Sequence, residues 1–313
     1  MKKKVNVLLS IYKPDLKFLK EQLISIENQD YENYSVIMND DCPDEKVDVQ
    51  FIKKYLKNTP FVILPYSEKN QGYVCSFEKL VNASDGDFLF FCDQDDIWFS
   101  NKISTCVNTM EKDHSLLVVS DRQIIDENDN VIIESVRKST SAPYQTWHTG
   151  DDIAKYNLFV TYGVGMSIAC DGKFARSCVP FCRCTGHDQW LISCAATEGI
   201  VSNIEVPLVQ YRKHSQNVTG TLKGISSKKD YKKFKLYKNN TFIHLFLDKY
   251  PNHKDRKEIE GFMDARYNGN IFGIFKYRYL ERQIAYFEII MNIIPNFMFS
   301  FLLKLARKIN KVM

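Results

Sequence analysis

Residues 88–98 read Phe-Leu-Phe-Phe-Cys-Asp-Gln-Asp-Asp-Ile-Trp, an apolar run of strand length that ends in Asp93, Asp95 and Asp96. An unpaired aspartate is costly to bury, so carboxylates directly after a buried strand require a cation or many hydrogen bonds. Mg²⁺ and Mn²⁺ are usually held by one or two carboxylates together with substrate phosphates. The stretch therefore predicts a metal and phosphate site. The alternative is an acidic turn that ends the strand and caps a helix starting near Asn101.

The chain around this stretch alternates short apolar runs with helical periodicity, which is typical of βαβ units and a mostly parallel sheet. Apolar residues between Phe18 and Ile26 recur on one helical face. Acidic residues also follow other strands, namely Asp40 and Asp41 after the second and Asp121 after the fifth. Ligands of open α/β sheets bind beyond the carboxyl ends of strands, so we expect one polar crevice there. The expected strands are residues 5–10, 35–38, 61–64, 88–92 and 116–120.

The overall composition is that of an ordinary globular protein. The 313 residues include 42 basic and 38 acidic side chains, which leaves a net charge of +4. So small an excess creates no general attraction for nucleic acid, and we expect no nucleic-acid partner. The nine cysteines contain no Cys-x-x-Cys pair, which favours reduced thiols. The opening Met-Lys-Lys-Lys runs into a short apolar strand and not into a secretion signal, so we expect a cytoplasmic protein.

The region from residue 130 to 212 has shorter and more mixed periodicity and indicates an added α+β half. Asp188 starts a helix, and its carboxylate is either a catalytic base or a first-turn acid that stabilises the helix dipole by about 0.3 to 1 kcal/mol. A polar cluster follows at residues 211–217. There Arg212 offers cationic donors for phosphate and His214 a metal ligand, unless the cluster is only a solvated loop. The expected strands are residues 131–133, 165–169 and 206–211.

Together, these clusters and their order resemble a family 2 glycosyltransferase, one of the inverting enzymes that build bacterial surface polysaccharides. The resemblance covers residues 5–220. It implies the GT-A nucleotide-diphospho-sugar transferase fold, a Rossmann-like α/β fold with a mixed sheet flanked by helices. The Asp-Gln-Asp-Asp-Ile-Trp sequence and the later His-Asp-x-Trp are most similar to the rhamnosyltransferase-like branch. The stretches that carry the resemblance are Leu9-Ser10-Ile11-Tyr12, Asn39-Asp40-Asp41, Asn70-Gln71-Gly72, Cys92-Asp93-Gln94-Asp95-Asp96-Ile97-Trp98, Gly186-His187-Asp188 and Tyr211-Arg212-Lys213-His214.

For the donor, the resemblance implies a nucleoside pocket lined by Ser10, Tyr12 and Asp41. Asp41 would accept a hydrogen bond from the pyrimidine ring nitrogen of UDP or dTDP, and Asp93 would lie near the ribose. One departure concerns the turn after the second strand, where the usual Asp-Asp-Gly-Ser is replaced by Asp-Asp-Cys-Pro-Asp at residues 40–44. Proline fixes φ and removes a backbone donor, so we expect altered backbone contacts to the nucleotide.

For the reaction centre, the resemblance implies that Asp95 holds a Mn²⁺ or Mg²⁺ ion bridging the donor diphosphate, with Asp96 as a second candidate ligand. Arg212 and His214 would steady the departing diphosphate, and His214 is also a candidate metal ligand. Asp188 would be the catalytic base. It would deprotonate an acceptor hydroxyl, whose oxygen attacks the anomeric carbon in one in-line displacement and inverts the configuration.

The implied activity is that of a metal-dependent hexosyltransferase. It would move a sugar from dTDP-rhamnose or a UDP-hexose to a hydroxyl of a lipid-linked glycan in O-antigen, capsule or cell-wall polysaccharide synthesis. The alternative is a non-catalytic subunit of a polysaccharide assembly complex that keeps a nucleotide-sugar pocket. A sugar nucleotidyltransferase is disfavoured because residues 9–16 contain no glycine and so lack a glycine-rich phosphate loop.

The C-terminal region, residues 221–313, is expected to be a helical unit separate from a catalytic domain over residues 1–220. It is rich in lysine and aromatic residues. Residues 284–305 are apolar enough to suggest a membrane span, but a glutamate, two asparagines and a proline near the middle are costly in lipid. The pattern favours an interfacial helix at the inner face of the bacterial plasma membrane. The alternative is a helical pair that packs on the catalytic domain or on a second copy of the chain.

Overall fold

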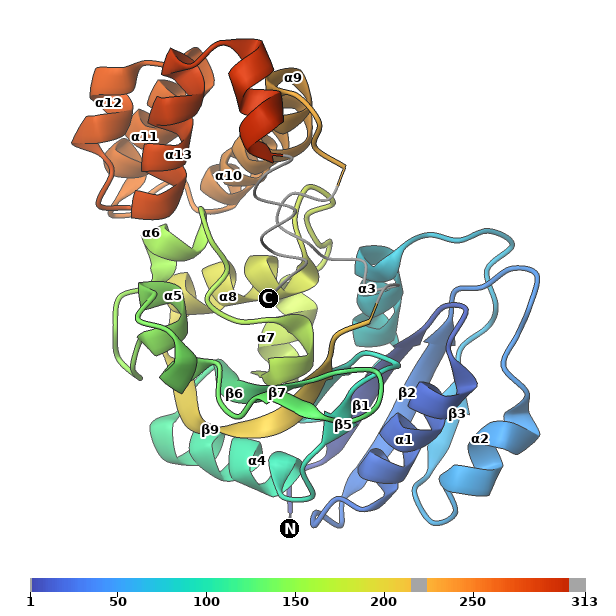
Figure 1. Cartoon of the computed structure of the whole chain (residues 1–313). Helices are drawn as coiled ribbons and strands as arrows, with labels where there is room; N and C mark the ends of the chain where they lie inside the picture. The colour runs from blue at the N-terminus through green and yellow to red at the C-terminus, as the bar shows by residue number, and fades with distance from the viewer. Residues whose placement is uncertain (1, 215–223, 304–313) are drawn as a thin grey trace. The chain divides into compact units, whose positions relative to one another are not determined.

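The computed structural model describes residues 2–214 and 224–303, and the chain divides into two compact units (Figure 1). The first unit carries the β-sheet, and the described part of the second contains helices and loops without a strand. The boundary expected at residue 220 lies outside the described residues. The first unit comprises Met1–Asn157 and Thr161–Ser215, and the second comprises Leu158–Val160 and Gln216–Met313.

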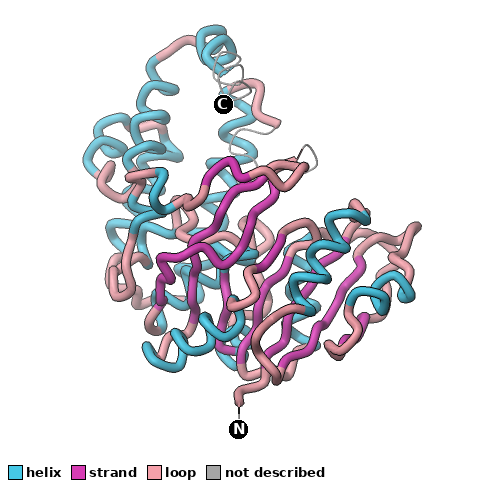
Figure 2. The backbone as a smooth tube through the Cα atoms, turned by 60° about the horizontal axis from the view of Figure 1, so that its bottom comes forward, coloured by secondary structure: helices cyan, strands magenta, loops and turns pink. Residues whose placement is uncertain are grey.

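The first unit is built on one β-sheet, whose strands are drawn in magenta in Figure 2. Its nine strands follow the order β3-β2-β1-β4-β8-β6-β9-β5, with β7 paired to β6. β1 is parallel to β2 and β4, whereas β8 is antiparallel to both β4 and β6, and β9 runs parallel to β6. The sheet is therefore mixed, with β8 between a parallel N-terminal half and the half that contains β6 and β9. The strands are β1 (Val5–Ile11), β2 (Tyr34–Asp40), β3 (Phe61–Ile63), β4 (Phe88–Cys92), β5 (Ile97–Trp98), β6 (Leu117–Ile125), β7 (Val131–Ile133), β8 (Ile168–Asp171) and β9 (Val201–Arg212).

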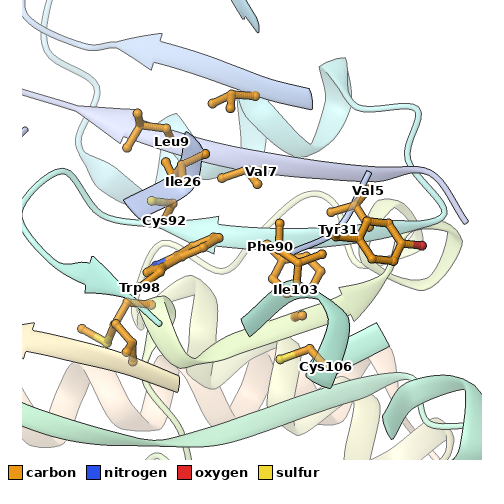
Figure 3. Packing of buried hydrophobic residues seen from close by; sticks show 14 of the residues in the cluster. Val5, Val7, Leu9, Ile26, Tyr31, Phe90, Cys92, Trp98, Ile103 and Cys106 are labelled. Carbon is orange, nitrogen blue, oxygen red and sulfur yellow. The ribbon is translucent and has the colours of Figure 1, made fainter. Parts of the chain in front are cut away.

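Helices cover the sheet on both faces because alternate side chains of a strand point to opposite sides. On one side, Val7 and Leu9 of β1 share a core with Ile103 of the helix after β5 (Figure 3). On the other side, Phe77 lies 5.5 Å from Phe91 of β4, measured between ring centroids. The helices are α1 (Leu16–Glu27), α2 (Val49–Tyr55), α3 (Tyr73–Ala83), α4 (Lys102–Asp113), η1 (Arg137–Ser139), α5 (Pro143–Thr146), α6 (Ala154–Asn157), η2 (Gly165–Ser167), α7 (Gly172–Ser177) and α8 (His187–Glu198).

The prediction of a strand at residues 165–169 is wrong for the first part of this range. Gly165–Ser167 form the 3₁₀ turn η2, and β8 begins only at Ile168. The side chain of Ser167 stabilises this turn, because its Oγ accepts the N–H of Val164 (3.2 Å) and donates to the C=O of the same residue (2.8 Å). The turn therefore replaces ladder pairing at these positions.

The segment after the acidic residues also differs from the expectation. Ile97 and Trp98 form the short strand β5, which pairs antiparallel with β9, before α4 begins at Lys102. The expected strands at residues 116–120 and 206–211 extend further as β6 and β9, because these two strands pair with each other over most of their length. Such pairing of segments far apart in sequence lengthens strands beyond their apolar runs.

The second unit packs its helices around a buried ion pair. Arg266 donates from Nε and Nη2 to the two carboxylate oxygens of Glu288 (3.0 and 2.9 Å), and the Tyr231 hydroxyl donates to the same carboxylate (2.8 Å). Glu288 therefore faces the interior of its own unit. None of the described helices has the length and apolar character needed to cross a membrane. The helices are α9 (Lys228–Tyr231), η3 (Lys232–Leu236), α10 (Tyr237–Lys249), α11 (Arg256–Asn268), α12 (Ile271–Lys276) and α13 (Arg282–Ile293).

Gly172 is required at the junction of β8 and α7. Its N–H donates to the C=O of Asp87 (2.7 Å), and a Cβ at this position would lie 2.1 Å from the backbone oxygen of Gly86. We expect Gly172→Ala to lower the free energy of unfolding, measured by urea denaturation, by about 2 to 3 kcal/mol, because the backbone near Gly86 must move to make room for the Cβ. Gly199→Ala is the matched control, since its Cβ would meet only the Leu116 side chain. Equal losses in both variants would contradict the backbone clash.

Candidate active site

The end of β1 is joined to the acidic loop after β4. Tyr12 lies directly after β1 and is 42% exposed. Gln94 of the loop accepts the N–H of Tyr12 (2.7 Å) and donates to its C=O (3.0 Å), much as a neighbouring strand would. On the same strand, the Ser10 hydroxyl lies 2.7 Å from the hydroxyl of Ser76 on α3. Two expected nucleoside residues, Ser10 and Tyr12, are thus placed between α3 and the acidic loop.

Asp41 follows β2 and is held by the backbone before α3. Its Oδ2 accepts the N–H groups of Gln71 (2.9 Å) and Gly72 (2.8 Å), and Gly72 has the left-handed φ of 83° that favours glycine. Its Oδ1 is buried and has no hydrogen-bond partner in the described ranges 2–214 and 224–303. A buried oxygen without a donor is unfavourable, so this carboxylate is suited to accept a donor from a ligand.

The unusual turn at Pro43 is stabilised by the preceding aspartate. Asp40 accepts the N–H of Cys42 through Oδ1 (3.0 Å) and the N–H of Val47 through Oδ2 (2.9 Å). Two backbone donors near the proline, those of Cys42 and Val47, are therefore bonded within the protein.

Asp95 and His214, which the resemblance names as candidate metal ligands, lie next to each other. Oδ2 of Asp95 lies 2.8 Å from Nε2 of His214, and both side chains are largely buried. Asp96 is fully buried, accepts a backbone N–H of β9 through Oδ1 (3.0 Å), and its Oδ2 lacks a partner within the described chain. Burial, reinforced by the nearby carboxylates of Asp95 and Asp188, raises the pKa of Asp93 to about 7. The loop thus gathers carboxyl groups whose charged form is disfavoured by burial and by one another, and a bound cation would favour their ionisation.

Arg212 is fully buried and faces protein acceptors. Its guanidinium forms ion pairs with Glu21 (2.7 Å) and Asp129, and lies 4.4 Å from the centre of the Phe18 ring. Its Nε donates to the C=O of Asp95 (3.0 Å). In this conformation Arg212 fixes the acidic loop, and the contact with a diphosphate stays a prediction.

Sequence reasoning missed Lys102, the other buried cation behind the loop. Its ammonium donates to the C=O of Met166 (2.5 Å) and lies 4.5 Å from the Trp98 ring centre. Burial lowers the pKa of Lys102, and the neighbouring thiols and acidic-loop carboxylates oppose this effect. A signal existed in the sequence, because Lys102 shares the buried face of α4 with Cys106 at the i, i+4 spacing.

Asp188 lies in the first turn of α8 and is half-buried. Its Oδ1 accepts the N–H of Gln189 (2.8 Å), and the N–H of Gly165 also bonds the carboxylate. Burial raises the pKa of Asp188 to about 6, although these N–H donors act in the opposite direction. A carboxylate whose pKa lies near neutrality is suited to general-base catalysis, beyond the helix-dipole role that any first-turn acid has.

The ring of His187, the residue before Asp188, is buried among aromatic side chains. Its ring centroid lies 4.0 Å from that of Phe77 and 5.0 Å from that of Phe91. Burial lowers the pKa of His187 to about 3. Neither ring nitrogen has a hydrogen-bond partner in the described part of the chain. A Cβ on Gly165 would lie 2.9 Å from this ring and 3.9 Å from Oδ2 of Asp93. Gly165 is therefore the point where the acidic loop and the start of α8 meet.

The side chains of Asp95 and His214 are suited to bind a divalent ion that is also bound by a substrate phosphate. Within the described residues, no three His, Cys, Asp or Glu side chains form a complete metal-binding group. Mg²⁺ and Mn²⁺ commonly take only one or two carboxylates from the protein and the remaining ligands from phosphate and water. Two adjacent donors beside an acidic loop are consistent with that arrangement.

Solved structures share this fold. The structure of S. aureus TarS 1-349 in complex with UDP-GlcNAc matches with a TM-score of 0.60 and 14% identity, over 86% of this chain and 72% of that one. The complex of the same protein with UDP gives a TM-score of 0.58 at 14% identity, over 84% of this chain and 71% of that one. The chain thus has the GT-A-like fold, a curled mixed sheet flanked by helices with further helices at the C-terminus.

Sequence comparisons agree with the fold. An uncharacterized glycosyltransferase of Methanocaldococcus jannaschii is 27% identical over 218 residues, which are 66% of this chain and 70% of that protein. An uncharacterized glycosyltransferase of Haemophilus influenzae is 24% identical over 156 residues, which are 50% of this chain and 61% of that protein. Residues 7–169, more than half of the chain, match the family described as glycosyl transferase family 2, and the chain belongs to that family.

Proposed function

We propose that the chain is an inverting, metal-dependent hexosyltransferase that uses a nucleoside-diphosphate sugar as donor. The observation that carries this proposal is the meeting at Gly165 of Asp188, a carboxylate with a pKa of about 6, and the acidic loop. A general base and a site for a charged diphosphate are the two parts that a single displacement at an anomeric carbon requires. The solved complexes of TarS with UDP and UDP-GlcNAc support such a donor.

The donor nucleoside would bind at the ends of β1 and β2. The unpartnered Oδ1 of Asp41 would accept the imide N–H that uracil and thymine share. Ser10, Tyr12 and Asp93 would line the remaining pocket, with Asp93 near the ribose. We propose dTDP-rhamnose or a UDP-hexose as donor. The Asp-Gln-Asp-Asp-Ile-Trp sequence supports the first, and the fold shared with TarS supports the second.

Asp95 and His214 would hold a Mn²⁺ or Mg²⁺ ion, and the buried Asp96 is the additional candidate ligand. The ion would neutralise charge on the departing nucleoside diphosphate. Arg212 would act by positioning the loop, because its guanidinium is bonded to Glu21 and to the backbone of Asp95.

The transfer itself would be one displacement. Asp188 would take the proton from an acceptor hydroxyl while the oxygen forms a bond to the anomeric carbon. The bond from that carbon to the diphosphate oxygen would break, and the nucleoside diphosphate would leave with the electron pair. Because attack and departure occur on opposite faces, the configuration of the anomeric carbon would invert.

The acceptor would be a lipid-linked glycan of O-antigen, capsule or cell-wall polysaccharide synthesis at the inner face of the bacterial plasma membrane. Residues 284–305 and the neighbouring lysines support a location at a membrane surface. A homo-oligomer is the alternative use of the same region, and a non-catalytic nucleotide-sugar-binding subunit is the alternative to catalysis.

The proposed roles separate donor binding from catalysis. We expect Asp95→Ala to weaken Mn²⁺-dependent binding of UDP or dTDP at least about tenfold in calorimetry, because a metal ligand is lost. Asp188→Ala should leave this affinity within about twofold and lower transfer at least about 100-fold, the usual effect of removing a general base. Equal losses of binding in both variants would contradict the division of roles. Nucleotide binding by the wild type without any transfer would favour the non-catalytic alternative.

The pKa of Asp188 predicts the pH dependence of transfer. A base must be ionised, so kcat/KM should rise with pH through about 6 and become constant above it. The measurement is kcat/KM between about pH 5 and 8 with saturating metal ion. Asp93→Asn serves as the control, because its own raised pKa could affect the profile, and the transition near 6 should persist in it. A profile that is flat across this range would exclude Asp188 as the base.

Replacing Gly165 should affect the position of Asp188 more than the binding of the donor. A Cβ would press on the His187 ring, so Gly165→Ala should displace Asp188 and lower kcat by about tenfold to 100-fold with donor KM little changed. A weaker Gly165 N–H bond would also move the pH transition upward, because that bond lowers the pKa of Asp188. Gly163→Ala is the matched control, since its Cβ would meet only Val119 and Ile192. The same change of pH profile in both variants would refute this role.

A further inference from the structure

The end of the second unit is apolar on two sides. Met291 on α13, together with Phe299 and Leu303 in the helical residues 296–303, is buried in a small core of this unit. The opposite side also carries large apolar groups and faces solvent. The exposed fractions are 52% for Ile290, 65% for Ile293, 74% for Phe297 and 65% for Phe301.

We call these four exposed side chains the apolar row. Ile290 and Ile293 are three residues apart in α13, and Phe297 and Phe301 are four residues apart in the next helical segment, so each pair lies on one helical face. Groups of large apolar side chains in water are unfavourable and typically mark a contact surface.

A lysine-rich segment lies directly beside the apolar row. Residues 228–238 contain six lysines and one acid, Asp230, whose carboxylate bonds Ser226. The segment is fixed there, because the Lys228 ammonium donates to the C=O of Ile294 and the Ser300 hydroxyl to the C=O of Ser226 (3.2 Å). Figure 1 shows α9 next to the C-terminal helical segment.

The sequence that continues from the row has the same character. Residues 289–313 contain four basic and no acidic residues. Within the described residues the positive charge beside the apolar row comes from the lysine-rich segment, and the four basic residues that follow in sequence lie outside the described residues.

We infer that the apolar row and its flanking lysines bind the surface of an anionic lipid bilayer. A bilayer interface offers acyl chains to the apolar row and anionic headgroups to the lysines, so it complements both features together. A second copy of the chain would cover the apolar row but would bring lysines against lysines, and like charges at an interface disfavour association. The inference rests on the proposed function in one respect only, namely that membrane binding would bring the enzyme to a lipid-linked acceptor.

The test is flotation of the full chain with vesicles of phosphatidylcholine containing phosphatidylglycerol, and with vesicles of phosphatidylcholine alone. We expect the chain to bind the anionic vesicles and to bind the neutral vesicles at least about tenfold more weakly. About 0.5 M salt should weaken binding to the anionic vesicles, because salt screens the attraction between the lysines and the headgroups. Phe297→Asp should reduce binding about tenfold or more. Because this side chain is 74% exposed, the variant should remain folded, which its unfolding midpoint would show.

Phe272→Asp is the matched control, since Phe272 on α12 is 89% exposed but outside the apolar row. Binding should persist in this control and should fall several-fold in Lys229→Glu/Lys233→Glu at low salt. Equal loss in Phe272→Asp, equal binding to neutral vesicles, or a dimer abolished by Phe297→Asp with no vesicle binding would each overturn the inference. Calorimetry with UDP and dTDP on the same samples keeps the two proposals apart, because vesicle binding without nucleotide binding would refute only the proposed function.

Discussion

The site depends on the compensation of buried negative charge. Three aspartates follow a fully buried strand, an arrangement that destabilises a fold unless cations or donors are close. Arg212, at the end of β9, donates from Nε to the C=O of Asp95, and Lys102, at the start of α4, provides an ammonium that favours ionised Asp93 and Asp96. Since Arg212 also donates its backbone N–H to Asp96, it joins the last strand to the loop after β4. The contacts that make burial possible therefore also determine where the carboxylates point.

The acidic loop connects two parts of the sheet that carry different proposed roles. The parallel part, from β3 to β4, carries the groups suited to a nucleotide, including Asp41, whose Oδ1 has no partner among the described residues. The other part, reached through β8, leads to α8 and the half-buried Asp188. The two meet at Gly165, where the absence of a side chain allows the His187 ring and the acidic loop to approach. The strand order therefore places the groups proposed to bind the donor near the group proposed to accept the proton.

Much of this arrangement follows from sequence, and the rest depends on contacts between distant segments. The apolar run of β4 gives its bounds, 88–92, and the family resemblance brought Asp95 and His214 together as candidate metal ligands, which lie 2.8 Å apart. Periodicity could not reveal β5, because two residues form a strand only through β9. The contact of Lys102 with Met166 joins residues 64 positions apart, and no local pattern contains it. Asp188 was found by its motif, while its raised pKa arises from burial that only the fold defines.

Many contacts that order the site are made by main-chain atoms. Asp41 is held by two backbone N–H groups, Gln94 by the N–H and C=O of Tyr12, and Lys102 by the C=O of Met166. Every residue carries a backbone C=O, and every residue except proline carries an N–H, so substitutions that keep the backbone conformation leave this support intact. The main-chain contacts that order this site can therefore survive the exchange of many side chains around it.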